Sequence, residues 1–155
     1  MKIRELLSLR RVLVHQTYSG WEDAISRATG GFLLEGVDVV AGYIEALIRR
    51  ERLFPTGLPT SPVGVAIPHA DPEYVIQPFL GIVTLTSPIL FREMGDPESQ
   101  VWVSVMIVVG LTNEKSSEQT NVLSRLVEIF EDEQVLREIY DANNPETILS
   151  ILEEK

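Results

Sequence analysis

The chain has 155 residues, with 13 Lys or Arg against 23 Asp or Glu, so its formal net charge is -10 and non-specific nucleic-acid binding is not expected. It contains no cysteine, which excludes disulfides, thiolate metal sites and a cysteine nucleophile. Because residues 1–14 are too charged for a signal peptide and no apolar run could span a bilayer, we expect one cytoplasmic domain over residues 1–155.

The first half of the chain predicts one strand followed by two helices. Residues 11–18 have the composition of a strand, and Ser19 with Glu22 forms a capping-box pattern that predicts a helix to about Leu34. Residues 37–52 predict a second helix, which ends before a Phe-Pro pair. Four apolar side chains of that segment share one helix face: Val40, Tyr43, Ile44 and Leu47.

The second half predicts a buried sheet and a helical end. Three apolar runs have the composition of strands buried on both faces, which requires helices on both sides of the sheet: residues 63–67, 79–85 and 101–111. Spacings typical of βαβ units and of hairpins both occur, so the sheet should be mixed. Further helices are expected at residues 116–132, 132–140 and 144–154. The predicted fold is α/β, a mixed sheet of about four to five strands flanked by helices on both faces.

His69 is the best candidate for a nucleophile or base. The sequence has no G-x-x-x-x-G-K-[ST], G-x-G-x-x-G, H-E-x-x-H or G-x-S-x-G motif. Pro68 cannot donate a ladder hydrogen bond, so His69 should lie where a strand ends and a loop begins. A neutral ring, which prevails at pH 7, has a free nitrogen lone pair that can attack phosphorus. The spacing also fits an ordinary turn histidine, and His15 is expected to be an ordinary strand histidine.

Several short motifs occur in the order typical of one family. The stretch RRERLFPTGLPTSPVGVAIPHAD, residues 49–71, resembles the active-site region of the enzyme IIA component of the bacterial sugar phosphotransferase system, in the mannitol/fructose-type family. Residues 87–95, 101–111 and 123–132 also resemble that family. The motif FPTGL, with the longer loop that follows it, is most similar to the galactitol-type branch.

This resemblance implies a phosphotransferase with a phosphohistidine intermediate at His69. The phosphoryl group would come from the histidine-containing phosphocarrier protein and pass to an enzyme IIB component during sugar or polyol uptake. The resemblance implies no metal or nucleotide cofactor, and contact with the membrane only indirectly, through the enzyme IIC component. Two alternatives stay open: a nitrogen-type regulatory protein whose phosphorylation state controls a binding partner, and an inert interaction module.

Four further residues are candidates for supporting the phosphoryl group. Arg50 matches the arginine of the family's Arg-Glu pair, and helical geometry lets it reach inward while Arg49 points away. Thr56 and Gly57 could contribute a hydroxyl and a backbone N–H, although a plain turn fits equally well. Gln119 matches a position where many family members carry a second histidine. Glutamine can donate a hydrogen bond but cannot change charge near pH 7, and an exposed glutamine in the first helical turn is equally compatible.

Overall fold

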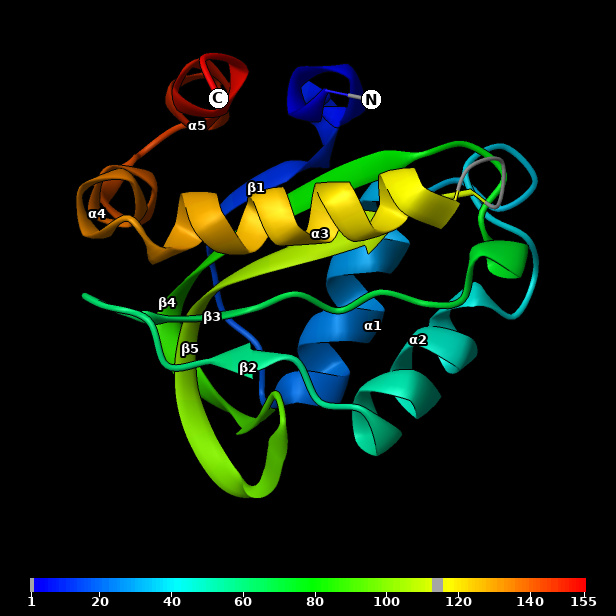
Figure 1. Ribbon diagram of the computed structural model, residues 1–155, viewed down its shortest axis with the longest axis horizontal. Helices are drawn as coiled ribbons and strands as arrows, with labels where there is room; N and C mark the ends of the chain where they lie inside the picture. Colours follow the sequence, from blue (N-terminus) through cyan, green and yellow to red (C-terminus); the bar gives the residue numbers. More distant parts are fainter. Residues whose placement is uncertain (1, 113–115) are drawn as a thin grey trace.

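The fold is built around a long antiparallel hairpin (Figure 1). The computed structural model describes residues 2–112 and 116–155, with side chains from Thr120 onward in the second range. The hairpin consists of β4 (Phe79–Glu93) and β5 (Asp96–Gly110). The sequence predicted only the apolar part of each strand. The extension of β5 is polar and mostly exposed, whereas that of β4 has three exposed residues, 86–88, followed by the buried Ile89 and Phe91. A shift in pairing between Thr84 and Ile89 interrupts the alternation of β4.

Three shorter strands complete a five-stranded mixed sheet. Strand β1 (Val12–Gln16) runs parallel to β4, and β3 (Gly64–Ala66) runs parallel to β5. Strand β2 (Gly57–Leu58) pairs antiparallel with β3. The predicted mixed sheet is confirmed, while β2 was missed because two residues in a Gly- and Pro-rich loop carry no periodic pattern.

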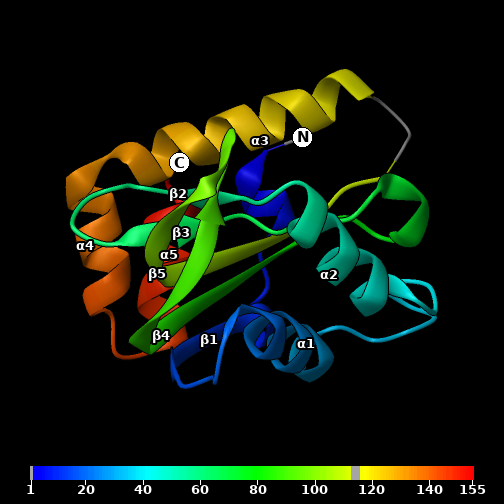
Figure 2. The same ribbon diagram turned by 90° about the horizontal axis from the view of Figure 1, so that it is seen from below.

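Helices cover both faces of the sheet, as expected (Figure 2). One core packs α1 (Trp21–Phe32) and α2 (Tyr43–Leu53) against the sheet. The other core packs α3 (Ser116–Glu131), α4 (Glu133–Asp141) and α5 (Pro145–Glu153) against the opposite face. Three short 3-10 helices span Ile3–Leu6, Leu9–Arg11 and Pro72–Tyr74.

The start of α1 differs from the predicted capping box. The residue before the helix is Gly20, and no side chain caps it. Instead, the backbone N–H of Ser19 donates to Asp23 Oδ2 at 2.9 Å, and Glu22 pairs with Arg52 at 3.4 Å. The helix prediction is confirmed, but the assignment of Ser19 and Glu22 to its cap is wrong.

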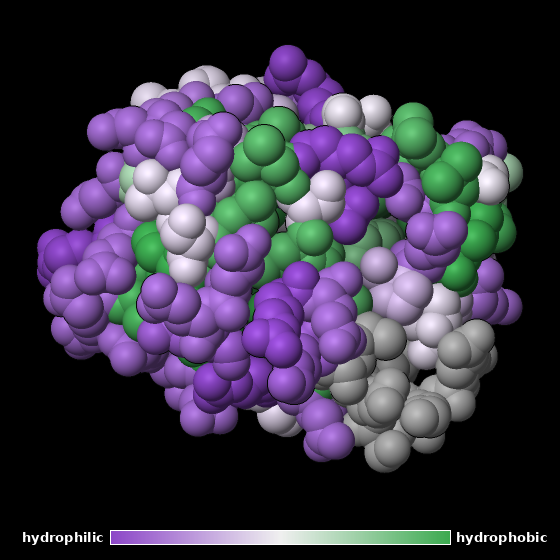
Figure 3. All heavy atoms as spheres, turned by 90° about the horizontal axis from the view of Figure 1, so that it is seen from above, coloured by the Kyte–Doolittle hydropathy of each residue, from purple (hydrophilic) through white to green (hydrophobic). Residues whose placement is uncertain are grey.

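The second predicted helix starts six residues later than expected, at Tyr43 rather than at residue 37. The buried Asp38 holds the preceding segment in another conformation, since its carboxylate accepts from Leu34 N at 2.8 Å and from Arg10 Nη2 at 3.2 Å. Gly42 then has φ = 89°, a left-handed conformation outside any helix. Apolar residues of this loop consequently stay on the surface: Leu34, Val37 and Val40. Figure 3 shows apolar side chains exposed among polar ones on the face seen from above.

Asp38→Ala should destabilise the fold by about 1–3 kcal/mol, because it leaves the Leu34 N–H and the Arg10 guanidinium without their buried acceptor. Urea unfolding of the variant and the wild type measures the difference. Glu128→Ala is the control, since it removes an exposed i,i+3 pair with Arg125. Equal unfolding midpoints for the two variants would contradict this role of Asp38.

Candidate active site

His69 lies where the chain leaves β3, as the Pro-His pair predicted. After β3, Ile67 and Pro68 are buried, and the carbonyl of Pro68 accepts from the N–H of Val109 on β5 at 3.0 Å. This bond extends the pairing of β3 with β5 by one bridge, between His69 and Val109. The imidazole is therefore attached to a strand end that is fixed on a buried sheet.

The tautomer of His69 follows from its partner. Nδ1 lies 2.9 Å from the carbonyl oxygen of Ile67, and a carbonyl can only accept, so Nδ1 carries the proton and Nε2 keeps its lone pair. Burial lowers the pKa of His69 below its ordinary value. The bond to Ile67 opposes that shift, Arg50 adds to it, and Asp71 opposes it. A neutral ring with a free Nε2 is the nucleophilic form.

The lowered pKa predicts that His69 remains nucleophilic in mild acid. Protonation fills the Nε2 lone pair, and the folded pKa lies below the usual value of about 6.5. Phosphoryl acceptance should thus persist at pH 6.5 and fall only as the pH decreases further. An NMR titration of the His15→Ala variant measures this directly, since His69 is then the only histidine. A midpoint above 6.5 would contradict the prediction.

Arg50 points into the site and Arg49 away from it, in agreement with the helical geometry. Arg50 Nη1 donates to Asp71 Oδ1 at 2.9 Å, and the guanidinium lies over the ring of Phe54, 5.4 Å from its centroid. Arg49 is exposed, and its Nη2 donates to the hydroxyl of Tyr74 at 3.4 Å. Asp71 thus already occupies one edge of the guanidinium that a phosphoryl group would need.

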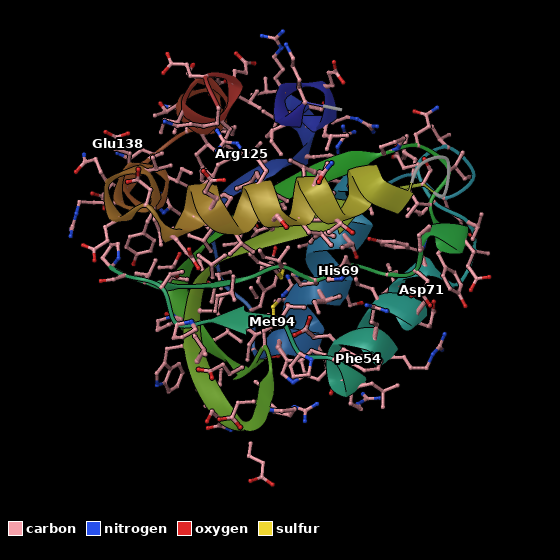
Figure 4. All side chains as sticks on the ribbon, viewed as in Figure 1. Phe54, His69, Asp71, Met94, Arg125 and Glu138 are labelled. Atoms are coloured by element: carbon pink, nitrogen blue, oxygen red, sulfur yellow. The ribbon has the colours of Figure 1, made fainter. Side chains whose placement is uncertain are left out.

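His69 and Arg50 together line two neighbouring hollows. The larger is a cleft of about 520 Å³ with mainly apolar walls, to which Phe54 contributes from the end of α2 and Met94 from the hairpin turn. Leu123 and Val127 of α3 form the facing wall. The smaller, of about 150 Å³, also borders Asp71 and Pro72. Figure 4 shows His69 beneath α3, with Asp71 to one side and Phe54 and Met94 below it.

Thr56 and Gly57 have contacts that the sequence did not predict. The Thr56 hydroxyl donates to Glu51 Oε1 at 2.8 Å, and its backbone N–H donates to Glu51 Oε2 at 2.8 Å. Gly57 belongs to β2, where a Cβ would meet the carbonyl oxygen of Arg92 at 2.6 Å. Neither a plain turn nor a free donor pair describes these residues. Their support of a phosphoryl group stays a prediction, and Thr56 would have to release Glu51 to provide it.

Burial also perturbs Glu51. The desolvated carboxyl has its pKa raised to about 7, although the two bonds from Thr56 and the charges of Arg92 and Arg50 favour its ionised form. This carboxyl group lies immediately behind the site, and it should gain or lose its proton near pH 7.

The two remaining candidates do not join this cluster. His15 is exposed on β1, where its Nε2 lies 3.1 Å from Asn143 Oδ1, and it lines neither hollow. Gln119 falls in α3, but its side chain lies outside the described residues, so its role stays a prediction. Within the described ranges, no three His, Asp or Glu side chains gather as a metal site. In the same part of the chain, no helix has the length and apolar character needed to cross a membrane.

Comparison with known families decides what kind of protein carries this site. The family model described as "Phosphoenolpyruvate-dependent sugar phosphotransferase system, EIIA 2" matches residues 5–155. The chain belongs to this family. The resemblance found in the sequence, to the mannitol/fructose-type enzyme IIA, is thereby confirmed.

Curated relatives of this EIIA-family chain differ in length. The 2-O-alpha-mannosyl-D-glycerate-specific EIIABC component of Escherichia coli is 24% identical over 157 residues, which cover 100% of this chain and 23% of that protein. The chain spans 17% of the multiphosphoryl transfer protein 1 of the same organism. The mannitol-specific phosphotransferase enzyme IIA component of Staphylococcus aureus is 28% identical, and the match covers 97% of this chain and 96% of the relative.

Solved structures share the EIIA fold. The nitrogen regulatory protein IIA-Ntr of Neisseria meningitidis has a TM-score of 0.78 at 24% identity, covering 97% of this chain and 98% of that one. Enzyme IIAMTL of Escherichia coli, solved in complex with phosphorylated enzyme IIBMTL, has a TM-score of 0.74 at 20% identity, covering 96% and 98%. At these identities the likeness shows the fold alone.

Proposed function

We propose that this EIIA-family chain is a phosphotransferase that carries a phosphoryl group on His69. The carrying observation is the His69 ring itself: its proton is fixed on Nδ1 by the Ile67 carbonyl, its Nε2 has no hydrogen-bond partner among the described residues, and Arg50 lines the same cleft. The donor would be the histidine-containing phosphocarrier protein and the acceptor an enzyme IIB component. Residues 1–155 would act as one cytoplasmic domain in this exchange.

The chemistry needs no group beyond these side chains. The Nε2 lone pair attacks phosphorus, a new N–P bond forms, and the bond to the donor histidine breaks with its electron pair returning to the donor. The Nδ1 proton stays in place throughout. In the second step the acceptor's nucleophile attacks phosphorus and the Nε2–P bond breaks. Arg50 would stabilise the charge on the transferring oxygens, exchanging Asp71 for phosphate, because a guanidinium binds such oxygens in a fork.

The walls of the cleft suit a transient protein partner. Phe54 and Met94 are 62% and 41% exposed, large values for apolar side chains beside a reactive group. Apolar contact with a partner would cover the cleft and keep water from the phosphorus during transfer. Membrane contact would be indirect, through the enzyme IIC component. The FPTGL spelling at residues 54–58 favours the galactitol-type branch, whereas the relatives above carry mannitol and mannosylglycerate names.

One reconstitution tests the proposal. The chain is incubated with labelled phosphoenolpyruvate, enzyme I and the phosphocarrier protein, and the modified residue is mapped by mass spectrometry under alkaline conditions. Acid-labile label on His69, which a matching enzyme IIB component removes, is the expected result. Label on another residue, or none, would overturn the assignment.

The nitrogen-type regulatory role remains the alternative. The fold likeness to a nitrogen regulatory protein is as good as the likeness to transport components, so the fold does not separate the two. The names of the curated relatives reported above favour transport. Transfer of the label from His69 to a purified enzyme IIB component would favour transport over regulation.

A further inference from the structure

A buried carboxylate lies directly behind His69 and takes no part in the steps proposed above. Glu51 follows Arg50 on α2, and only 4% of its surface is exposed. Both of its oxygens accept from one residue, Oε1 from the Thr56 hydroxyl and Oε2 from the Thr56 N–H, each at 2.8 Å. A charged group is seldom buried unless its partners are fixed, so this arrangement needs a reason.

The hydrogen bonds continue from Thr56 to the reactive ring. The Thr56 hydroxyl accepts from the backbone N–H of Ile67 at 3.1 Å. The carbonyl of the same Ile67 accepts from His69 Nδ1–H at 2.9 Å. Both backbone polar groups of Ile67 are thus engaged in one chain of bonds that begins at Glu51 and ends at His69.

We propose that Glu51 is a positioning residue for phosphoryl transfer, which acts through Thr56 and Ile67 to fix the orientation and tautomer of His69. The inference rests on the proposed function and deepens it, since it assigns how the acceptor ring is held. It also explains how Arg50 is held in place relative to His69. Arg50 and Glu51 are neighbours on α2, so the bonds from Glu51 tie the helix that carries the guanidinium to the strand end that carries the imidazole.

The identity of the side chain matters at each step. In its ionised form Glu51 only accepts, so the Thr56 hydroxyl must direct its proton to Glu51 and keep its lone pairs for the Ile67 N–H. The charged groups facing Glu51 are Arg50 from its own helix and Arg92 from β4, and both favour the carboxylate. A glutamine in place of Glu51 could still accept from the Thr56 N–H through its carbonyl oxygen, but its NH2 group would donate to the Thr56 hydroxyl. The hydroxyl could then no longer direct its proton to residue 51, so the direction of that bond would be reversed.

Two substitutions interrupt the chain of bonds at different points. Glu51→Gln replaces one acceptor with a donor and reverses the bond of the Thr56 hydroxyl, and Thr56→Val removes the hydroxyl while keeping the volume. Nitrogen-15 NMR of the ring reports the fraction of His69 with the proton on Nδ1, at a pH where the ring is neutral. We expect both variants to move proton density from Nδ1 to Nε2 and to slow phosphoryl acceptance about tenfold, the size of effect expected when one hydrogen bond of the chain is lost or reversed. Thr56→Ser restores the hydroxyl and should recover the wild-type spectrum.

Matched controls separate positioning from stability. Asp38→Asn changes another buried carboxylate, and Thr29→Val removes another buried hydroxyl, which donates to Ile25 O at 2.7 Å in α1. Both should lower the thermal midpoint and leave the His69 nitrogens unchanged. The proposal is overturned if Glu51→Gln and Thr56→Val also lower only the midpoint, or if the ring changes while the transfer rate does not. Failure of the wild type to take label would instead overturn the proposed function.

Discussion

A His69→Ala variant is expected to fold normally and to take up no phosphoryl group from the phosphocarrier protein. The side chain is only partly buried at a strand end, so its removal leaves little cavity, while the ring nitrogen Nε2 that would attack phosphorus is lost. Intact-mass measurement after incubation with phosphoenolpyruvate, enzyme I and phosphocarrier protein gives the stoichiometry. Circular dichroism checks the fold.

His15→Ala is the matched control for that loss. This exposed ring has Asn143 as its hydrogen-bond partner and lines neither hollow, so full uptake should remain. Acid-labile phosphate in His69→Ala, or its loss in His15→Ala, would reverse the choice of histidine.

An Arg50→Ala variant is expected to accept the phosphoryl group about a hundredfold more slowly, with the fold intact. Removing a charged donor from oxygens that gain charge in the transition state typically has an effect of this size. Arg50 is also partly exposed, which limits the structural cost of its loss. Rapid-quench measurement of single-turnover transfer gives the rate.

Arg49→Ala tests whether the direction in which an arginine points, and not its charge alone, determines the rate of phosphoryl transfer. The two arginines are adjacent and carry the same charge, but Arg49 is exposed and lines neither hollow. Its substitution should change the rate far less. Asp71→Asn adds a further check, since loss of the competing carboxylate should free Arg50 for phosphate. Equal effects of Arg49→Ala and Arg50→Ala would refute the roles given to these side chains.

The sequence could predict the elements whose signal is local. The apolar runs at residues 63–67 and 101–111 identified interior strands, and Pro68 placed His69 at a strand end. The start of α2 could not be predicted, because the helical spacing of apolar residues continues through Val40. What stops the helix there is the contact of Asp38 with Arg10, 28 residues earlier in the chain.

The position of His69 at a strand end was predictable, but its environment was not. Arg50 and Arg49 were separated correctly because a helix fixes which neighbour points inward. Asp71 was missed as the partner of Arg50, since it lies 21 positions later in the chain, after a reversal of direction. Glu51 was visible beside Arg50, yet its bonds to Thr56 depend on how the chain turns after α2. No spacing rule encodes that turn.

The short strand that leads to His69 is anchored from both sides. Val65 and Ile67 belong to the core under α3, and Ala66 belongs to the core under α1 and α2. Such a segment exchanges its amide hydrogens slowly and opens only with the whole domain. Loading and unloading the histidine should therefore leave the backbone unchanged. Any protein that distinguishes the loaded from the empty carrier would then have to detect the added charge and bulk themselves.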